Sequence, residues 1–376
     1  MNKETAMKKL GFGLMRLPLT DPQDNGSIDI ERAKAMVDRF MAEGFTYFDT
    51  AFPYHNTQSE GAFKKAVADR YPRESYVLTD KLSLFRIEKA EDIPSYFERQ
   101  LETLGVEYLD YYLLHAMSAA AYERATQFGA FEFVQQKKAE GKIRSVGFSF
   151  HDSPEVLDKI LTEHPEMEVV QLQINYLDWQ DSNVRAKECY EIAMKHNKAV
   201  IIMEPVKGGA LANVSPEAIS LYKGSRPELS PAGWAVSFCA SLDGVFMVLS
   251  GMSTEEQLED NMSYMKDFIP FSNEEIAIAE KMGEIVREDN AIACTACKYC
   301  VDDCPQKIAI PDIFKIYNNF CRFQKANPAG AQRSYNGICE NTGKASACIE
   351  CGLCETNCPQ HLPIREYLKE IANQFE

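Results

Sequence analysis

The sequence predicts an α/β protein whose residues 1–270 form a (β/α)8 barrel and whose residues 291–376 form a mainly helical, cysteine-rich domain. A connecting helix is expected over residues 271–290. Eight apolar segments of strand character alternate with helical segments, which is the pattern of a parallel sheet with crossover helices. Reactive side chains stand where three successive strands end, and ten of the twelve cysteines lie in residues 294–358. We therefore expect two domains with different chemistry.

The predicted strands are short, apolar and regularly spaced. They are expected at residues 10–18, 46–49, 76–81, 109–115, 143–150, 169–176, 199–205 and 245–251. Glycines in the first of them allow a close approach of neighbouring backbone. A doubly wound open sheet is the alternative, but eight regular units at this length favour a closed TIM barrel.

The helical segments carry recognisable start and stop signals. They are expected at residues 29–42, 60–71, 91–104, within 122–140, from 154 onward, at 181–196, at 231–240 and from 254 onward. Gly44 and Gly105 follow two of them, as glycines often follow helices. Pro154 occupies a first helical position, and Thr254 with Gln257 forms a capping box.

Composition and charge exclude several classes of partner. The formal net charge is −16, so a nucleic-acid backbone would be repelled and is not expected as a partner. No apolar run approaches the roughly 18 residues that a membrane-spanning helix needs. Residues 1–16 lack the apolar core of a secretory signal, which predicts a cytoplasmic protein. In that compartment a cysteine cluster indicates metal binding rather than disulfides.

Four reactive side chains are expected on one rim of the barrel. Asp49, Lys81 and His115 end three successive strands, and Tyr54 follows the first of these strands. Each residue alone has an ordinary explanation, such as a helix cap, a solvated charge or a core ring with its hydroxyl paired. The intervals of about one strand-plus-helix unit place all four at the carboxyl ends of parallel strands, where barrels carry their active sites.

The cysteines form a duplicated motif, CxxCxxCxxxCP, whose second copy is shifted by 54 residues. Its members are Cys294, Cys297, Cys300 and Cys304, and then Cys348, Cys351, Cys354 and Cys358. This spacing is that of bacterial two-cluster ferredoxins, in which the fourth cysteine ligates the other cluster. Structural zinc is the alternative, although zinc has no need of a third CxxC step. Cys321 and Cys339 break the repeat and are expected to be non-ligands.

These residues resemble a known family. Asp49, Tyr54, Lys81 and His115 look like the catalytic tetrad of the aldo-keto reductases. Residues 147–151 and 203–209 resemble the branch of that family with a C-terminal, ferredoxin-like domain for two [4Fe–4S] clusters. The resemblance implies a nicotinamide cofactor, NAD(P)H, and an oxidoreductase acting on a small carbonyl or alcohol substrate.

The resemblance also implies which residues bind the cofactor. Ser149 and Gln171 would contact the carboxamide, Met203 the ring, and residues 205–209 the pyrophosphate. The cofactor-binding residues implied in this way are Ser149, Gln171, Met203, Pro205, Lys207, Gly209, Gly251, Gln257 and Asn261. Two positions depart from the common pattern, because Phe150 stands where many members have asparagine and Met203 where many have tyrosine.

The tetrad suggests how a carbonyl would be reduced. Tyr54 is the expected proton donor, and a free tyrosine titrates near pH 10, too high to work well at neutral pH. We expect Lys81 to lower the pKa of Tyr54, Asp49 to hold Lys81 charged, and His115 to orient the carbonyl.

The nucleotide and the electron path remain open. Residues 251–265 contain no lysine or arginine but several acids, which favours NADH over NADPH. Hydride transfer moves two electrons whereas each cluster takes one, so a flavin in the barrel or an external redox protein partner would be needed to join them. The alternatives are a flavin-containing electron-transfer enzyme and clusters that only stabilise the fold.

Overall fold

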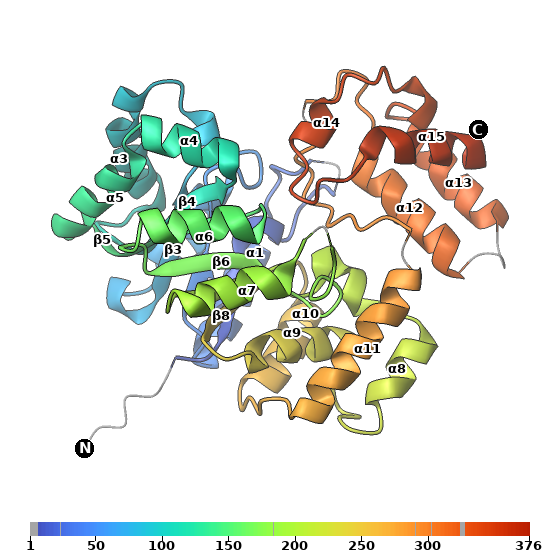
Figure 1. Cartoon of the computed structure of the whole chain (residues 1–376), viewed down its shortest axis with the longest axis horizontal. Helices are drawn as coiled ribbons and strands as arrows, with labels where there is room; N and C mark the ends of the chain where they lie inside the picture. The colour runs from blue at the N-terminus through green and yellow to red at the C-terminus, as the bar shows by residue number, and fades with distance from the viewer. Residues whose placement is uncertain (1–6, 23, 183, 290, 302, 324–327) are drawn as a thin grey trace. The chain divides into compact units, whose positions relative to one another are not determined.

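The computed structural model describes all residues except 1–6, 23, 183, 290, 302 and 324–327. Within the described residues, eight parallel strands close into a barrel in chain order, β1 to β8 (Figure 1). They are β1 Leu10–Gly13, β2 Tyr47–Asp49, β3 Val77–Leu82, β4 Leu109–Met117, β5 Ile143–Phe150, β6 Val169–Gln173, β7 Ala199–Met203 and β8 Val245–Ser250. The predicted barrel is confirmed.

Helices follow the strands around the barrel, as Figure 1 shows for α3, α5 and α6. They are α1 Ile30–Ala42, α2 Ser59–Phe63, α3 Ile93–Leu104, α4 Ala119–Gln127, α5 Ala130–Ala139, α6 Pro154–Glu163, α7 Ala186–Lys195, α9 Pro231–Ser241 and α10 Glu255–Met265. Thr254 caps α10, because its hydroxyl accepts a hydrogen bond from the Gln257 amide.

Three helical predictions differ from the structure. The segment 122–140 is two helices, α4 and α5, because Gly129 between them has a left-handed φ of 64°. The segment 60–71 begins as α2 and continues as a π-helical turn over Lys64–Ala68. Strand β6 ends at Gln173 and α7 begins only at Ala186, so the intervening loop is longer than predicted.

The barrel is held together by apolar side chains on both sides of the strands. One buried apolar cluster joins residues of β2, β4, β6, β7 and β8: Tyr47, Leu113, Val169, Ile201, Met247 and Leu249. Outside the barrel, the Phe40 ring of α1 lies 5.5 Å from Phe12 and 5.7 Å from Phe48, both edge-on. Burying each such ring contributes about 1.5–3 kcal/mol, so these contacts fix the strands and the residues at their ends.

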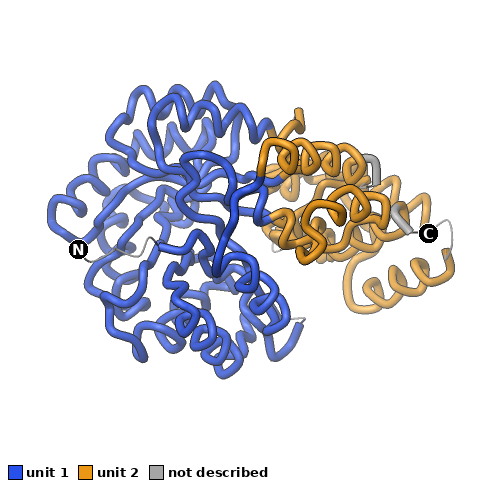
Figure 2. The backbone as a smooth tube through the Cα atoms, turned by 90° about the horizontal axis from the view of Figure 1, so that it is seen from below, with its two compact units in different colours: residues 1–175, 185–205, 236–271 blue, residues 176–184, 206–235, 272–376 orange. Residues whose placement is uncertain are grey.

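The chain divides into two compact units (Figure 2). The first contains residues 1–175, 185–205 and 236–271, and therefore all eight strands. The second contains residues 176–184, 206–235 and 272–376. Segments that follow β6 and β7 thus belong with the cysteine-rich residues, while the predicted domain boundaries stay a prediction.

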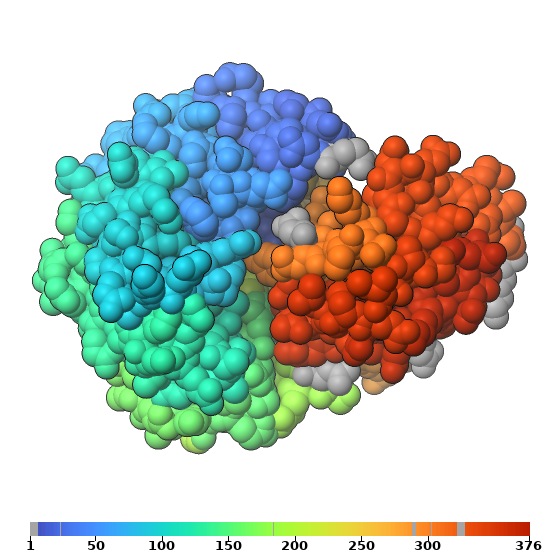
Figure 3. All heavy atoms as spheres, turned by 90° about the horizontal axis from the view of Figure 1, so that it is seen from above, coloured from blue at the N-terminus to red at the C-terminus, as the bar shows by residue number. Residues whose placement is uncertain are grey.

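The second unit is helical. Its helices are α8 Pro216–Tyr222, α11 Asn273–Asp289, α12 Ile310–Phe323, α13 Pro328–Cys339, α14 Leu353–Thr356 and α15 Ile364–Phe375. No helix was expected where α8 lies. Phe314 of α12 and Leu368 and Ile371 of α15 belong to its core, which also includes Cys300, Cys354 and Cys358. The C-terminal residues, orange to red in Figure 3, gather into one continuous mass. No helix in the described part of the chain is long and apolar enough to cross a membrane.

Candidate functional site

A buried ion pair lies at the carboxyl ends of β2 and β3. The Lys81 ammonium donates hydrogen bonds to Asp49 Oδ1 at 2.6 Å and to the Thr50 carbonyl at 2.8 Å. The two charged side chains are only 1% and 4% exposed. Gln171 Nε2 donates to the other carboxylate oxygen of Asp49 at 3.2 Å, so the carboxylate is held on both sides. Burial raises the pKa of Asp49, and the Lys81 charge opposes that shift.

Tyr54 and His115 stand beside this pair. Lys81 Nζ lies 5.1 Å from the centre of the Tyr54 ring, and the Tyr54 and His115 rings are 6.0 Å apart and nearly perpendicular. The structure therefore brings the four predicted residues to one rim of the barrel.

The net pKa of Tyr54 is raised, not lowered as expected, because burial and other groups outweigh any effect of Lys81. Burial raises the pKa of Tyr54 well above 10, and the carboxylates of Asp49 and Glu204 raise it further. The lysine charge is already engaged by Asp49 and Thr50. Tyr54 therefore keeps its proton at neutral pH.

His115 is held as a neutral ring. Burial lowers its pKa well below 6.5, and the nearby Lys81 charge and His151 lower it further. Ser83 Oγ lies 2.7 Å from His115 Nδ1 and is fully buried. Sequence reasoning missed Ser83, although the two-residue alternation of a strand would place it on the same face as Lys81.

An acid and an arginine near Tyr54 were also missed. Glu204 directly follows β7 with a left-handed φ of 56°, which is unusual for a residue with a side chain. One of its oxygens lies 3.5 Å from Arg16 Nη2. The charges of Glu204 and Arg16 act on Tyr54 in opposite directions. The sequence could have predicted Glu204 as a site residue, because it is an acid directly after a barrel strand.

The residues expected to meet the nicotinamide lie at the ends of neighbouring strands. Ser149 on β5 pairs in register with Gln171 on β6, and both are buried. Ser149 Oγ accepts a hydrogen bond from the Ala116 amide at 2.8 Å. Met203 ends β7 and is half-buried. Their position fits a ring bound at the rim, and their contacts to a cofactor stay predictions.

The residues after β8 have partners that were not foreseen. Gly251 is exposed, Gln257 accepts a hydrogen bond from the Ser253 amide, and Asn261 bonds to the Gln257 carbonyl. Two acids of this segment pair with arginines of α1, since Glu255 lies 2.9 Å from Arg32 Nε and Glu259 lies 2.8 Å from Arg39 Nε.

Lys207 lies inside the second unit. It is 1% exposed, and its ammonium donates to Asp178 Oδ1 at 2.5 Å and to Gln360 Oε1 at 3.0 Å. The two following glycines have left-handed φ values of 62° and 95°, which lets the chain turn sharply there. A contact of Lys207 or Gly209 with a nucleotide phosphate stays a prediction.

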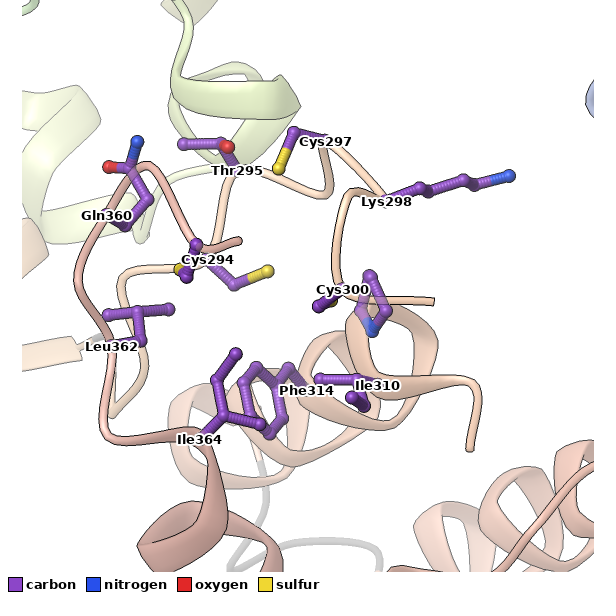
Figure 4. Close-up of a pocket in the computed structure, with 12 residues that line it drawn as sticks. Cys294, Thr295, Cys297, Lys298, Cys300, Ile310, Phe314, Gln360, Leu362 and Ile364 are labelled. Carbon is purple, nitrogen blue, oxygen red and sulfur yellow. The ribbon is translucent and has the colours of Figure 1, made fainter. Parts of the chain in front are cut away.

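The eight repeat cysteines surround two cavities in the crossed pattern that the spacing predicts. The first cavity is lined by Cys294, Cys297, Cys300 and Cys358, the second by Cys304, Cys348, Cys351 and Cys354. Figure 4 shows the first cavity, with Ile310, Phe314 and Ile364 completing its wall. Neither Cys321 nor Cys339 lines either cavity.

The first cavity fits a thiolate-ligated cluster. Burial raises the pKa of the Cys294 thiol to about 12, a cost that ligation to iron removes because it favours the thiolate. The Ala296 amide lies 3.4 Å from Cys294 Sγ and can donate to it, as amides do to cluster sulfurs. Within the described residues, no three histidine, cysteine or acidic side chains are arranged to hold a single metal ion.

Comparisons with known proteins match both parts of the chain. The model for the aldo/keto reductase family matches residues 9–284, and the model for a 4Fe-4S dicluster domain matches residues 293–362. Among solved structures, an aldo-keto reductase from Bacillus halodurans in its holo form has a TM-score of 0.59 at 24% identity, covering 74% of this chain and 94% of that one. An aldo-keto reductase from Klebsiella pneumoniae in complex with NADPH has a TM-score of 0.58 at 20% identity, covering 73% and 91%. At these identities the two structures establish the fold.

Curated relatives share the barrel. An aldo-keto reductase from Mycolicibacterium smegmatis is 29% identical over 43% of this chain and 53% of its own length. An NADH-specific methylglyoxal reductase from Escherichia coli is 20% identical over 75% of this chain and 96% of its own length. The matches to the first curated relatives span about half the length of those proteins.

Proposed function

The chain belongs to the aldo/keto reductase family and carries a 4Fe-4S dicluster domain, and from this premise we propose that it reduces a small carbonyl compound, or oxidises the corresponding alcohol, by hydride transfer. The observation that carries the proposal is the buried Asp49–Lys81 pair with Tyr54 and His115 beside it. A bound nicotinamide would supply or accept the hydride.

The four side chains have distinct roles in this proposal. Tyr54 holds a proton at neutral pH and gives it to the oxygen of the substrate as negative charge develops there. His115 is neutral and can donate one hydrogen bond that orients the carbonyl, provided that Nδ1 accepts from Ser83 and Nε2 carries the proton. Lys81, fixed by Asp49, places a positive charge near the oxygen.

The nucleotide is proposed to be NADH. A 2′-phosphate after β8 would meet Glu255, Glu256 and Glu259, and the arginines closest to two of these acids are already paired with them. Relatives differ in this respect, since one is named NADH-specific and another was solved with NADPH. The proposed preference for NADH over NADPH is therefore independent of the proposal that the protein transfers hydride to a carbonyl.

The clusters are proposed to carry single electrons, either to an external redox protein or through a flavin bound in the barrel. The two adjacent four-cysteine cavities with crossed ligation support this, because a second cluster extends an electron path. Clusters that only stabilise the second unit are the rival explanation, since cysteines from both repeats lie in its core. The predicted cytoplasmic location belongs to the same proposal.

Anaerobic purification followed by two measurements tests the function. We expect iron and sulfide for two [4Fe–4S] clusters per chain, and oxidation of NADH that depends on an added aldehyde or ketone. Bound flavin without nicotinamide turnover would contradict the hydride proposal and favour the flavin alternative. An absorption spectrum of the released cofactors separates the two.

A further inference from the structure

The segment after β7 is built into the cysteine-rich unit. Residues 206–235 belong to the second unit, although they directly follow a barrel strand. Lys207 has a left-handed φ of 48° and is almost fully buried. A lysine in this conformation and without exposure needs a compensating partner, since burying an ammonium is costly.

The same segment covers the first cysteine cavity. A Cβ added to Gly208 would lie 2.1 Å from the Thr295 carbonyl oxygen, so only glycine allows this approach. Thr295 lines the first cavity and is 2% exposed. Gln360, which accepts a hydrogen bond from Lys207, lines it as well. One residue therefore separates the Lys207 ammonium from the cavity.

The Lys207 charge lies close enough to the first cavity to act on a cluster there. Its ammonium donates a 3.0 Å hydrogen bond to Gln360, and Gln360 lines the cavity. The effect of a charge is strong there because water is excluded and the local dielectric is low. The Asp178 carboxylate accepts a hydrogen bond from the same ammonium at 2.5 Å, and its negative charge opposes the effect of Lys207.

We propose that Lys207 sets the reduction potential of the cluster held by Cys294, Cys297, Cys300 and Cys358, instead of binding the phosphates of a nucleotide. Reduction adds one electron and so one negative charge to the cluster, and a nearby buried cation stabilises that state. This deepens the electron-carrying role proposed above and rests only on the presence of the clusters, not on hydride transfer.

The second cavity provides a matched control. Arg365 lines it and is paired with Glu355 at 2.7 Å. Lys298 also lines the first cavity, but this lysine is exposed, so solvent screens its charge more than that of the buried Lys207. The side chains of Arg365 and Glu355 are 41% and 22% exposed, compared with 1% and 2% for Lys207 and Asp178. Solvent screens the exposed pair, so its influence on the second cluster is smaller.

The test is an anaerobic redox titration, followed by electron paramagnetic resonance, of protein loaded with both clusters. In Lys207→Gln, we expect the reduced-to-oxidised ratio of one cluster at a fixed potential to fall about tenfold, which equals 59 mV for a one-electron couple. Asp178→Asn removes the opposing charge and should raise the potential of the same cluster. Arg365→Gln should lower the reduction potential of the other cluster, and by a smaller amount. Because each variant shifts a different cluster, the comparison also shows which resonance signal belongs to which cavity.

The double variant Lys207→Gln/Asp178→Asn avoids leaving an unpaired buried charge and decides the matter. The proposal predicts a first-cluster potential below that of the wild type in this variant. An unchanged potential in fully loaded double variant would overturn it, as would a tenfold weaker affinity for NADH in Lys207→Gln with both potentials unchanged. Neither readout uses carbonyl turnover, so a failure of the hydride proposal would be seen separately.

Discussion

The barrel rim and the cysteine-rich unit place reactive groups by different means. At the rim, Asp49, Lys81 and His115 come from three strands, and strand register with hydrogen bonding fixes them in a dry setting. In the cysteine unit, chain spacing fixes the sulfurs, and the surroundings differ between the cavities: Cys300 is buried and Cys351 is exposed. This difference is what the proposed division of roles requires: hydride transfer at the rim needs excluded water, whereas electron exchange by clusters needs only the approach of a partner.

The largest expected effect comes from a substitution that impairs the barrel rim and leaves the clusters unchanged. Tyr54→Phe keeps the ring and removes the proton, so we expect kcat for carbonyl reduction to fall by at least about 10²-fold. The cluster content and both cluster potentials should be unchanged, because Tyr54 belongs to the first unit. Near-normal kcat with any accepted carbonyl would show that Tyr54 is not the proton donor.

A second prediction concerns the pH dependence of stability that the buried carboxyl group of Glu60 gives to the barrel unit. Burial raises the pKa of Glu60 to about 7 from 4.5, beside Asp80 and bonded to Gln100 Nε2 at 2.9 Å. Between these pH values the folded state binds a proton that the unfolded state has released, so stability falls as the pH rises. Burial also raises the pKa of Asp80, which titrates together with Glu60, so Glu60→Gln should weaken this pH dependence without abolishing it. Denaturant unfolding from pH 5 to 8 gives the free energy of unfolding at each pH. The same dependence of that free energy on pH in the wild type and in Glu60→Gln would contradict the prediction.

A third prediction concerns the tautomer of His115. Ser83→Ala removes the hydrogen bond to Nδ1, and we expect kcat to fall by about tenfold, a typical effect of losing a partner that orients a reactive ring. Nitrogen NMR of the His115 ring should show loss of the single Nε2-protonated tautomer. Ser237→Ala, at a buried serine of α9, is the control and should leave kcat unchanged. An unaltered NMR signature in Ser83→Ala would argue against the role of Ser83.

The smallest effect concerns the nucleotide. We expect NADH to bind up to about fivefold more tightly than NADPH, because the acids after β8 are exposed and partly screened. Reversing one charge in Glu256→Lys should narrow the difference. Fluorescence titration with both nucleotides gives the ratio, and clearly tighter NADPH in the unaltered protein would refute the preference.

The sequence predicted those parts of the molecule that depend on periodicity and spacing. The spacing of the strand-plus-helix units placed Asp49, Lys81 and His115 at the carboxyl ends of their strands, and the cysteine intervals predicted the crossed cavities. It could not place Lys207, because its partner Gln360 lies 153 residues away and only folding brings them together. The direction of the Tyr54 pKa also depends on burial and on Glu204, which strand pattern alone does not reveal.

The central claim is that the barrel rim transfers hydride while the clusters transfer single electrons. Two assays on one folded variant test it most directly. Replacing Cys300 and Cys354 with serine removes one ligand from each cavity. Carbonyl reduction by NADH and reduction of a one-electron dye are then compared with the wild type. The account predicts that dye reduction is lost while carbonyl reduction, still dependent on Tyr54, continues. Wild-type rates in both assays would contradict it and leave the clusters with a structural role.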